Sequence, residues 1–296
     1  MIRKLTNVTA IDELIRLVPP PAAPVHARGD WQQVESSLGL GLPADFKQLI
    51  EHYGLGQFVD FITPLTPFGR YDLLMRGIRD LQESERAFRA FGTDEDPYTS
   101  DPDASPYAIY PEPGGLLQWA GTDNGDLLCW LTEGDPDQWT TVAWNQRDQC
   151  HDAHPVGAVG FLHGWLTGRI VTTVFRSRDR DEPAPWFEPY RDLRQVYVRL
   201  SDSAVPYDDR LRILRDSLAP TASRGGYERD GSRQDHFAAT GRGWRLTYET
   251  AYGHQIRIAF PPEDEKQARS LLLDAVGRMG CTVTAITTDR GQPTWT

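Results

Sequence analysis

The sequence feature that most constrains the fold is the segment RSRDRDEPAPWFEP, at residues 176–189, because its charged residues and prolines separate two apolar regions of the chain. Such a composition is typical of a linker between domains. The 296 residues are also enough for two hydrophobic cores. We therefore predict an N-terminal helix and proline-rich linker at 1–27, a first domain at 28–175 and a second at 190–296.

The first domain is predicted to place helices before strands. Pro19 ends an opening helix at 10–17, Asp30 can cap a helix that Gly39 ends, and Pro43 begins a third helix. A strand at 58–62 follows. Further helices are predicted at 71–89 and 156–167, and sheet strands at 107–110, 116–120, 127–131 and 140–144.

The second domain alternates its elements in a recognisable order. Two helices, at 208–218 and 263–279, separate the apolar strand runs VYVRL, RLTYET, QIRIAF and CTVTAIT. The polar residues 221–235 are predicted to form a loop. The order β-α-β-β-α-β predicts a small ferredoxin-like α+β domain, with two helices on one face of a four-stranded antiparallel sheet.

The net charge of −11 is concentrated in the first part of the chain. Residues 1–175 carry 12 lysines and arginines against 24 aspartates and glutamates, whereas 176–296 carry 19 against 18. Residues 90–146 contain 11 acidic side chains and no lysine or arginine. Such a surface repels nucleic acid and anionic membranes, and it attracts a basic protein.

We therefore predict a partner-binding site in this acidic stretch, with a basic protein as the partner. One aromatic side chain in a probable turn is predicted to be an exposed interface anchor. The predicted partner-binding residues are Asp94, Glu95, Asp96, Asp101, Asp123, Asp126, Asp135 and Trp139. Solvated acidic loops are the alternative interpretation of the same pattern.

Sequence patterns for catalysis and cofactors are weak. His151 and His154, with Asp152 and His163, could suggest a metal site, but Pro155 predicts a turn rather than a helix there. Neither a GxSxG elbow nor a phosphate-binding glycine pattern occurs in the sequence. We predict no catalytic residues, no cofactor and no metal.

The cysteines and the first 17 residues predict the cellular compartment. Cys129, Cys150 and Cys281 are odd in number and form no CxxC pair, which suits a reducing compartment. The first 17 residues contain charges where a signal peptide needs an apolar run. We expect a cytoplasmic protein that binds neither membranes nor nucleic acid, and the oligomeric state stays open.

A set of positions between about residues 28 and 170 resembles the SUKH superfamily, which includes yeast cell-wall regulators and bacterial immunity proteins. The opening of the motif comprises Trp31, Glu35, Leu38, Gly39, Leu42, Pro43, Phe46, Tyr53, Gly54 and Gly56. Later positions are Gly121, Thr122, Asp123, Gly125 and Asp126 between strands, then Phe161, Leu162 and Trp165 in the closing helix.

The resemblance implies an α+β fold with a mixed sheet flanked by helices, no enzymatic activity, and a protein-binding face. Its bacterial members typically neutralise toxins, so we expect an immunity protein that binds a basic, nuclease-type toxin. A regulatory scaffold that organises endogenous partners is one alternative. A hydrolase that uses the acidic loop with His151 or His154 is another.

Overall fold

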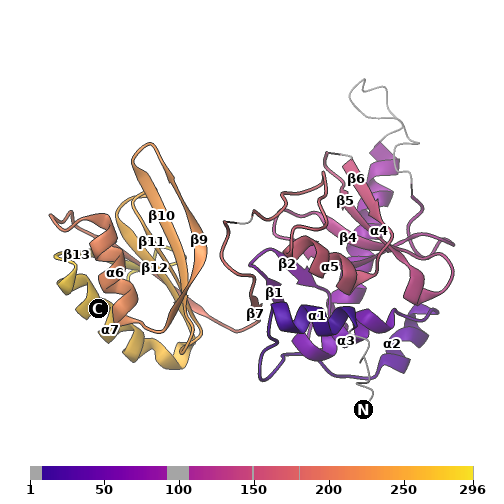
Figure 1. Cartoon of the computed structure of the whole chain (residues 1–296), viewed down its shortest axis with the longest axis horizontal. Coiled ribbons are helices and arrows are strands. Elements are labelled where there is room, and N and C mark those ends of the chain that lie inside the picture. The colour runs from indigo at the N-terminus through magenta and orange to yellow at the C-terminus, as the bar shows by residue number, and fades with distance from the viewer. Residues whose placement is uncertain (1–8, 92–106, 149, 180, 296) are drawn as a thin grey trace, which may run out of the picture. The chain divides into compact units, whose positions relative to one another are not determined.

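The computed structural model describes residues 9–91, 107–148, 150–179 and 181–295. The chain divides into two compact units, Met1–Tyr190 and Arg191–Thr296 (Figure 1). Each unit has its own hydrophobic core. Among the described residues, the structure contains no helix with the length and apolar character needed to cross a membrane.

Local capping sets the helices of the first unit. Thr9 and Asp12 form a reciprocal capping box, Asp30 accepts a hydrogen bond from the backbone of Gln33, and Gly39 ends a helix with φ +70°. These contacts confirm the predicted boundaries. The helices are α1 (Ala10–Leu17), α2 (Trp31–Leu38), α3 (Ala44–Tyr53), α4 (Leu73–Phe91) and α5 (Ala158–Leu166).

The sheet of the first unit has the strand order β6-β5-β4-β3-β2-β1-β7. The resemblance implied a mixed sheet, but every pairing between these strands is antiparallel. The strands are β1 (Gly56–Phe58), β2 (Ile62–Pro64), β3 (Leu116–Thr122), β4 (Leu127–Leu131), β5 (Thr140–Asn145), β6 (Cys150–His154) and β7 (Phe187–Pro189).

Three local predictions differ from the structure. The predicted strand at 58–62 spans the turn between β1 and β2, where Val59 and Asp60 adopt positive φ. Residues 107–110 form only an isolated bridge, between Ile109 and Leu116. The end of the predicted linker forms β7, because Phe187 packs against Tyr53 and Phe58. Buried aromatic contacts thus tie these residues to the first unit.

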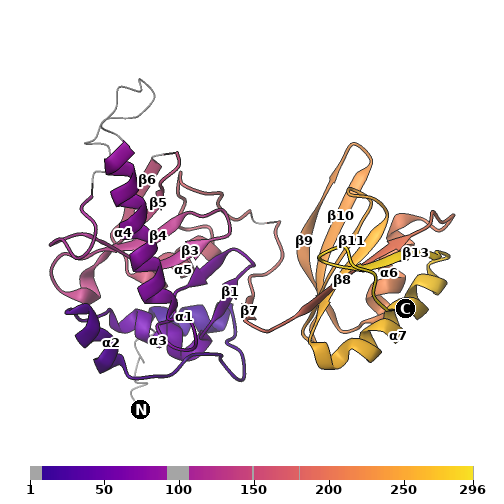
Figure 2. The same cartoon turned by 180° about the vertical axis from the view of Figure 1, so that it is seen from behind.

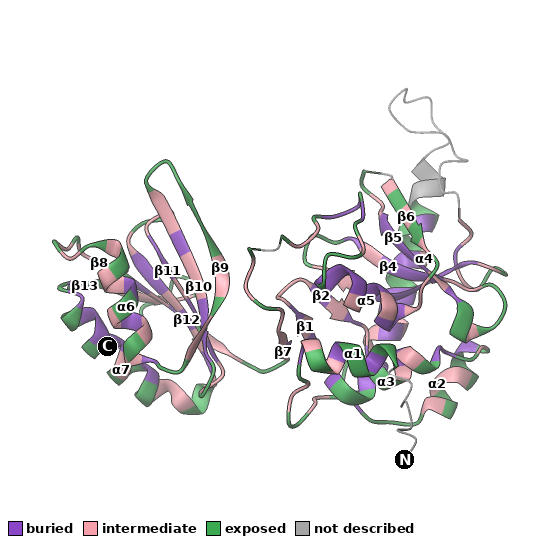
Figure 3. Cartoon of the chain, in the orientation of Figure 1, coloured by how far each residue is buried: buried purple, intermediate pink, exposed green. Residues whose placement is uncertain are grey.

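Helices cover both faces of the first sheet. α1 and α5 lie over one face, and α4 crosses the other (Figures 1 and 2). The larger core contains the stacked rings of Trp119 and Trp130, whose centroids are 6.0 Å apart. A smaller cluster around Cys129 and Trp144 includes Leu81 of α4. Figure 3 shows buried residues concentrated in these layers.

The second unit is a six-stranded antiparallel sheet in the order β13-β8-β12-β11-β10-β9, and α6 and α7 pack on one face (Figure 1). Its elements are β8 (Arg194–Leu200), α6 (Tyr207–Ser217), β9 (Thr221–Arg229), β10 (Ser232–Ala239), β11 (Trp244–Glu249), β12 (Gln255–Phe260), α7 (Glu265–Arg278) and β13 (Val283–Thr288).

The predicted β-α-β-β-α-β order is present as β8, α6, β11, β12, α7 and β13, with an additional hairpin inserted. Residues 221–235, predicted as a loop, form β9 and the start of β10. Asp230 and Gly231, both at positive φ, make the turn of that hairpin. β9 is an edge strand with few buried residues, so its sequence lacks the apolar alternation that signals a strand.

Candidate protein-interaction surface

The motif positions on α2 hold the helical layer together. The Trp31 ring packs edge-on against Phe68, with ring centroids 4.7 Å apart, and Trp31 Nε1 donates to Glu51 Oε1 at 3.3 Å. Glu35 accepts from the backbone N–H of Leu42 at 2.8 Å and forms an ion pair with Lys47. These two side chains therefore fix α2 against α3.

The motif positions at the end of α3 also have structural roles. The Tyr53 hydroxyl, fully buried, donates to the Val18 carbonyl at 2.6 Å. Gly54 adopts φ +65°, and a Cβ there would lie 2.1 Å from the Val25 carbonyl oxygen. Only glycine fits that backbone. These motif positions therefore stabilise the fold of the first unit.

The predicted acidic residues fall into two groups. Asp94, Glu95, Asp96 and Asp101 lie outside the described residues. Asp126 directly precedes β4, whereas Asp135 follows its other end. Five residues of strand separate the two ends by about 17 Å, at roughly 3.3 Å per residue. The described acids therefore lie at two different ends of β4.

Asp126 has a structural role, so its prediction as a partner-binding residue is wrong. Its side chain is 1% exposed, and its carboxylate accepts from Thr122 Oγ1 at 2.7 Å and from Asn145 Nδ2 at 2.9 Å. These bonds fix the turn between β3 and β4. Asp123, in the same turn, is exposed, and it accepts from Gln57 Nε2 at 2.6 Å.

The prediction of Trp139 as an exposed anchor is also wrong, because its side chain is 4% exposed and belongs to the core. Its ring lies 5.8 Å from that of Trp130. The prediction of an exposed anchor assumed a hairpin turn. Residues 136–138 instead form a short 3-10 helix, which directs the next residue inward.

Two neighbouring loops form an acidic surface. The loops comprise residues 110–115 and 132–138, and the backbone bond from Thr132 N to Gly115 O, at 3.3 Å, joins them. Neither loop contains a lysine or arginine. We call them the acidic loop pair, and its exposed acids are Glu112, Glu133, Asp135 and Asp137.

Two of these acids also stabilise the backbone. Asp135 accepts from the backbone of Asp137 at 3.0 Å, at the start of the 3-10 helix. Asp137 Oδ1 accepts from the Ala44 N–H at 2.7 Å, in the first turn of α3. Carboxylates are favourable at helix N-termini. The same aspartates therefore give the acidic loop pair its negative charge and hold its backbone in place.

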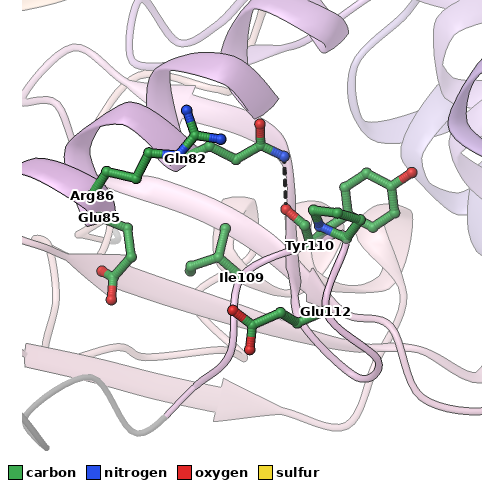
Figure 4. Close-up of a pocket in the computed structure, with 7 residues that line it drawn as sticks. Gln82, Glu85, Arg86, Ile109, Tyr110 and Glu112 are labelled. Atoms are coloured by element: carbon green, nitrogen blue, oxygen red, sulfur yellow. Dashed lines mark hydrogen bonds between the residues drawn. The ribbon is translucent and has the colours of Figure 1, made fainter. Parts of the chain in front are cut away.

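A small hollow adjoins the acidic loop pair, with a volume of about 130 Å³. Glu112 and Tyr110 line it from the loop, and α4 contributes Gln82, Glu85 and Arg86 (Figure 4). Gln82 Nε2 donates to the Tyr110 carbonyl at 2.8 Å. The sequence did not predict these α4 residues as part of a site, because helical periodicity does not show which loop packs against the polar face of the helix.

The histidines considered for metal or hydrolase chemistry do not converge. His151 and His154 lie on β6, three positions apart, so they point to opposite faces of the strand. Asp152 accepts from Thr172 Oγ1 at 2.8 Å. Across the described ranges, no three His, Cys, Asp or Glu side chains are placed to hold a metal ion.

The fold and these surfaces define an α+β domain with acidic exposed loops. Residues 28–154 match the SUKH_6 family model, described as SMI1-KNR4 cell-wall. This stretch of the first unit is therefore assigned to the SUKH superfamily. No curated protein and no solved structure matches the chain.

Proposed function

We propose that this chain is a non-catalytic protein-binding module that neutralises a basic, nuclease-type toxin through its first unit. Membership of the SUKH superfamily is consistent with an immunity or protein-binding role. The carrying observation is the stretch 90–146, which has 11 acidic side chains and no lysine or arginine. In this proposal the second unit, Arg191–Thr296, is an accessory domain, and the protein acts in the cytoplasm.

The acidic loop pair is the described part of the proposed contact surface. Its four exposed acids lie on loops whose own sequence contains no lysine or arginine, so this surface carries negative charge. Such a field accelerates association with a basic protein, and salt weakens it. It opposes binding of nucleic acid, because phosphates carry the same sign of charge.

Charge reversal tests the surface. Glu112→Lys, Glu133→Lys and Asp135→Lys together change the net charge by six units on the acidic loop pair. Because these residues are exposed, the fold should survive. We expect at least a tenfold weaker complex with the cognate toxin, identified by growth rescue, and a flatter dependence of affinity on salt.

A matched control places the same charge change elsewhere. Asp216→Lys, Glu263→Lys and Asp274→Lys alter three exposed acids of the second unit. The control should retain affinity within about threefold, since it changes the net charge by the same amount and leaves the acidic loop pair intact. Equal loss of affinity in both triple variants would contradict the proposed surface.

A further inference from the structure

The sheet of the second unit ends differently at its two edges. At the β13 edge the following residues fold back along the strand, where Thr288 N donates to Gln292 O at 2.8 Å and Thr294 N to Ile286 O at 3.1 Å. At the opposite edge, β9 pairs with β10 and with no other described strand (Figure 1). One edge is therefore covered by the chain itself, and the described residues leave the other available for pairing.

The outer half of β9 has a regular register. Arg224 is an extra residue that shifts the pairing with β10, and beyond it the pairing runs without interruption from Gly225 to Arg229. This stretch contains neither proline nor lysine, two residues that commonly protect an edge strand. Its two charges, on Glu228 and Arg229, cancel. The regular part of β9 is therefore an edge without net charge.

The hairpin turn determines which backbone groups of this edge point outward. Asp230 and Gly231 form a two-residue turn at positive φ, so Arg229 and Ser232 are the first hydrogen-bonded pair of the hairpin. Hydrogen-bonded and non-hydrogen-bonded pairs alternate along an antiparallel ladder. The N–H and C=O groups of Gly226 and Glu228 therefore point away from β10.

Exposed aromatic side chains lie beside the same edge. Tyr227 is 43% exposed, and Tyr252, in the turn between β11 and β12, is 73% exposed. Partial desolvation and the adjacent Tyr252 raise the pKa of Tyr227, so the two side chains are neighbours. Exposed tyrosines are enriched where protein surfaces meet. The edge thus combines outward backbone groups with apolar surface.

Tyr227 lies on the face of the sheet opposite α6 and α7. On the helical face, Tyr248 of β11 stacks on Tyr207 of α6, with ring centroids 4.7 Å apart. Successive side chains of a strand alternate between faces, so Glu249 points to the other face. Cross-strand pairing through β10 places Tyr227 in the same row as Glu249. A strand that joins this edge can therefore contact the ring without displacing a helix.

We propose that β9 pairs with β9 of a second copy of this chain, antiparallel, about a two-fold axis at Tyr227. Gly226 then lies opposite Glu228 of the second copy, and these pairs exchange backbone hydrogen bonds. The two Tyr227 residues form a non-hydrogen-bonded pair, in which side chains are closest. Both copies contribute the same edge, as a two-fold dimer requires, and their sheets become continuous.

Charge favours this register over its neighbours. The axis at Tyr227 places Arg229 opposite Gly225 and Glu228 opposite Gly226, so no like charges face each other. An axis at Glu228 would bring two carboxylates together, and one at Gly226 would extend the pairing into the irregularity at Arg224. The edge is self-complementary in this register, which favours a second copy as the occupant. This inference concerns the second unit and is independent of the proposed function.

The oligomeric state of the full chain tests the pairing. Sedimentation velocity across the micromolar range should show a concentration-dependent dimer with twice the 33.4 kDa mass of the chain. Glu228→Pro removes an outward N–H and keeps the bonds to β10, so it should weaken dimerisation at least tenfold. Glu228→Thr keeps the N–H and should dimerise within about threefold of wild type. A wild-type chain that stays monomeric, or equal affinities in both variants, overturns the inference.

Cysteine substitution tests the register. In a Cys150→Ser background, where the remaining cysteines are buried, Tyr227→Cys places two thiols at a non-hydrogen-bonded pair. The Cα separation of such a pair, about 4.5 Å, is within disulfide range. Mild oxidation should yield a covalent dimer on non-reducing electrophoresis. Arg229→Cys, on the same face but opposite glycine, should not. Equal cross-linking of both variants, or none of Tyr227→Cys, overturns the two-fold pairing.

Removal of the exposed rings provides a test that leaves the backbone unchanged. Tyr227→Thr with Tyr252→Thr keeps residues compatible with the hairpin and should weaken the dimer at least tenfold. The control is Tyr71→Thr, which removes a 55% exposed tyrosine of the first unit and should leave dimerisation unchanged. Equal dimer affinities in the control and the double variant would also overturn the inference.

Discussion

The two units stabilise buried carboxylates in different ways. In the second unit Glu249 is fully buried, and it accepts from Gln234 at 2.5 Å, Gln255 at 2.7 Å and Arg257 at 3.0 Å. In the first unit Asp126 has only neutral side-chain donors and the described contacts of Asp45 are backbone N–H groups. Arginine is thus among the donors to Glu249, whereas the printed donors to Asp126 and Asp45 are neutral dipoles.

The difference follows from the distribution of charge along the chain. Residues 1–175 have twice as many acids as bases, whereas 176–296 are nearly balanced. A carboxylate paired with arginine is neutralised inside the protein, but one held by neutral dipoles keeps its charge. The first unit therefore carries an excess of negative charge, while the second is nearly balanced.

Removing the cation beside Glu249 should have the largest effect. Arg257→Met leaves a buried carboxylate without its charge partner, and because the arginine is partly exposed we expect a loss of about 2–3 kcal/mol in unfolding free energy. Hydrogen exchange of β11 and β12 peptides measures it within the second unit. Arg199→Met, exposed on neighbouring β8, is the control and should cost under about 0.5 kcal/mol. Equal losses would remove the contrast between the units.

Asp126 gives the corresponding test in the first unit. Asp126→Ala leaves Thr122 and Asn145 without their acceptor in a buried turn, so we expect a loss of about 2 kcal/mol. Asp123→Ala, three residues earlier and exposed, should change stability by less than about 0.5 kcal/mol. Urea unfolding of both variants provides the comparison. A larger loss of stability at Asp123 than at Asp126 would contradict the structural role of Asp126.

Asp45 should make the first unit sensitive to pH. Burial raises its pKa above the ordinary 3.8, so the folded state binds this proton more tightly than the unfolded state. This contribution to stability therefore falls as pH rises from 3.8 through the raised pKa, and the cost remains at pH 7. Asp45→Asn should be at least as stable as wild type at pH 7 and should lose that advantage near pH 4. Urea titrations across this range measure the difference, and parallel curves would contradict it.

His254 should make the stability of the second unit depend on pH with the opposite sign to Asp45 and a smaller magnitude. Burial and the nearby Arg210 lower its pKa below 6.5, and Arg210 lies 3.1 Å from its Nε2. The folded state binds this proton less tightly, so stability falls as pH drops below 6.5. His254→Gln should flatten the decline between pH 7 and pH 5, followed by NMR of β12 during urea unfolding. The control is His151→Gln, an exposed position in the first unit, which should leave the decline in stability of the second unit unchanged.

Local sequence signals determined most helices and the central strands. Thr9, Asp30 and Gly39 act on backbone groups within a few residues, so helix ends can be predicted without knowledge of the fold. The apolar runs of β3, β4 and β5 also gave their strands directly. For the candidate site, the sequence determined the sign of the charge and the expected class of partner.

Only the tertiary structure decided which acids are exposed, because their partners lie far away in sequence. Asp137 caps α3 through Ala44, 93 residues away, and Asp45 contacts Val159, 114 residues away. The burial of Trp139 depends likewise on packing in the core of the first unit, which no local pattern encodes. Composition determines the net charge of a chain, whereas packing determines which charged side chains are exposed to solvent.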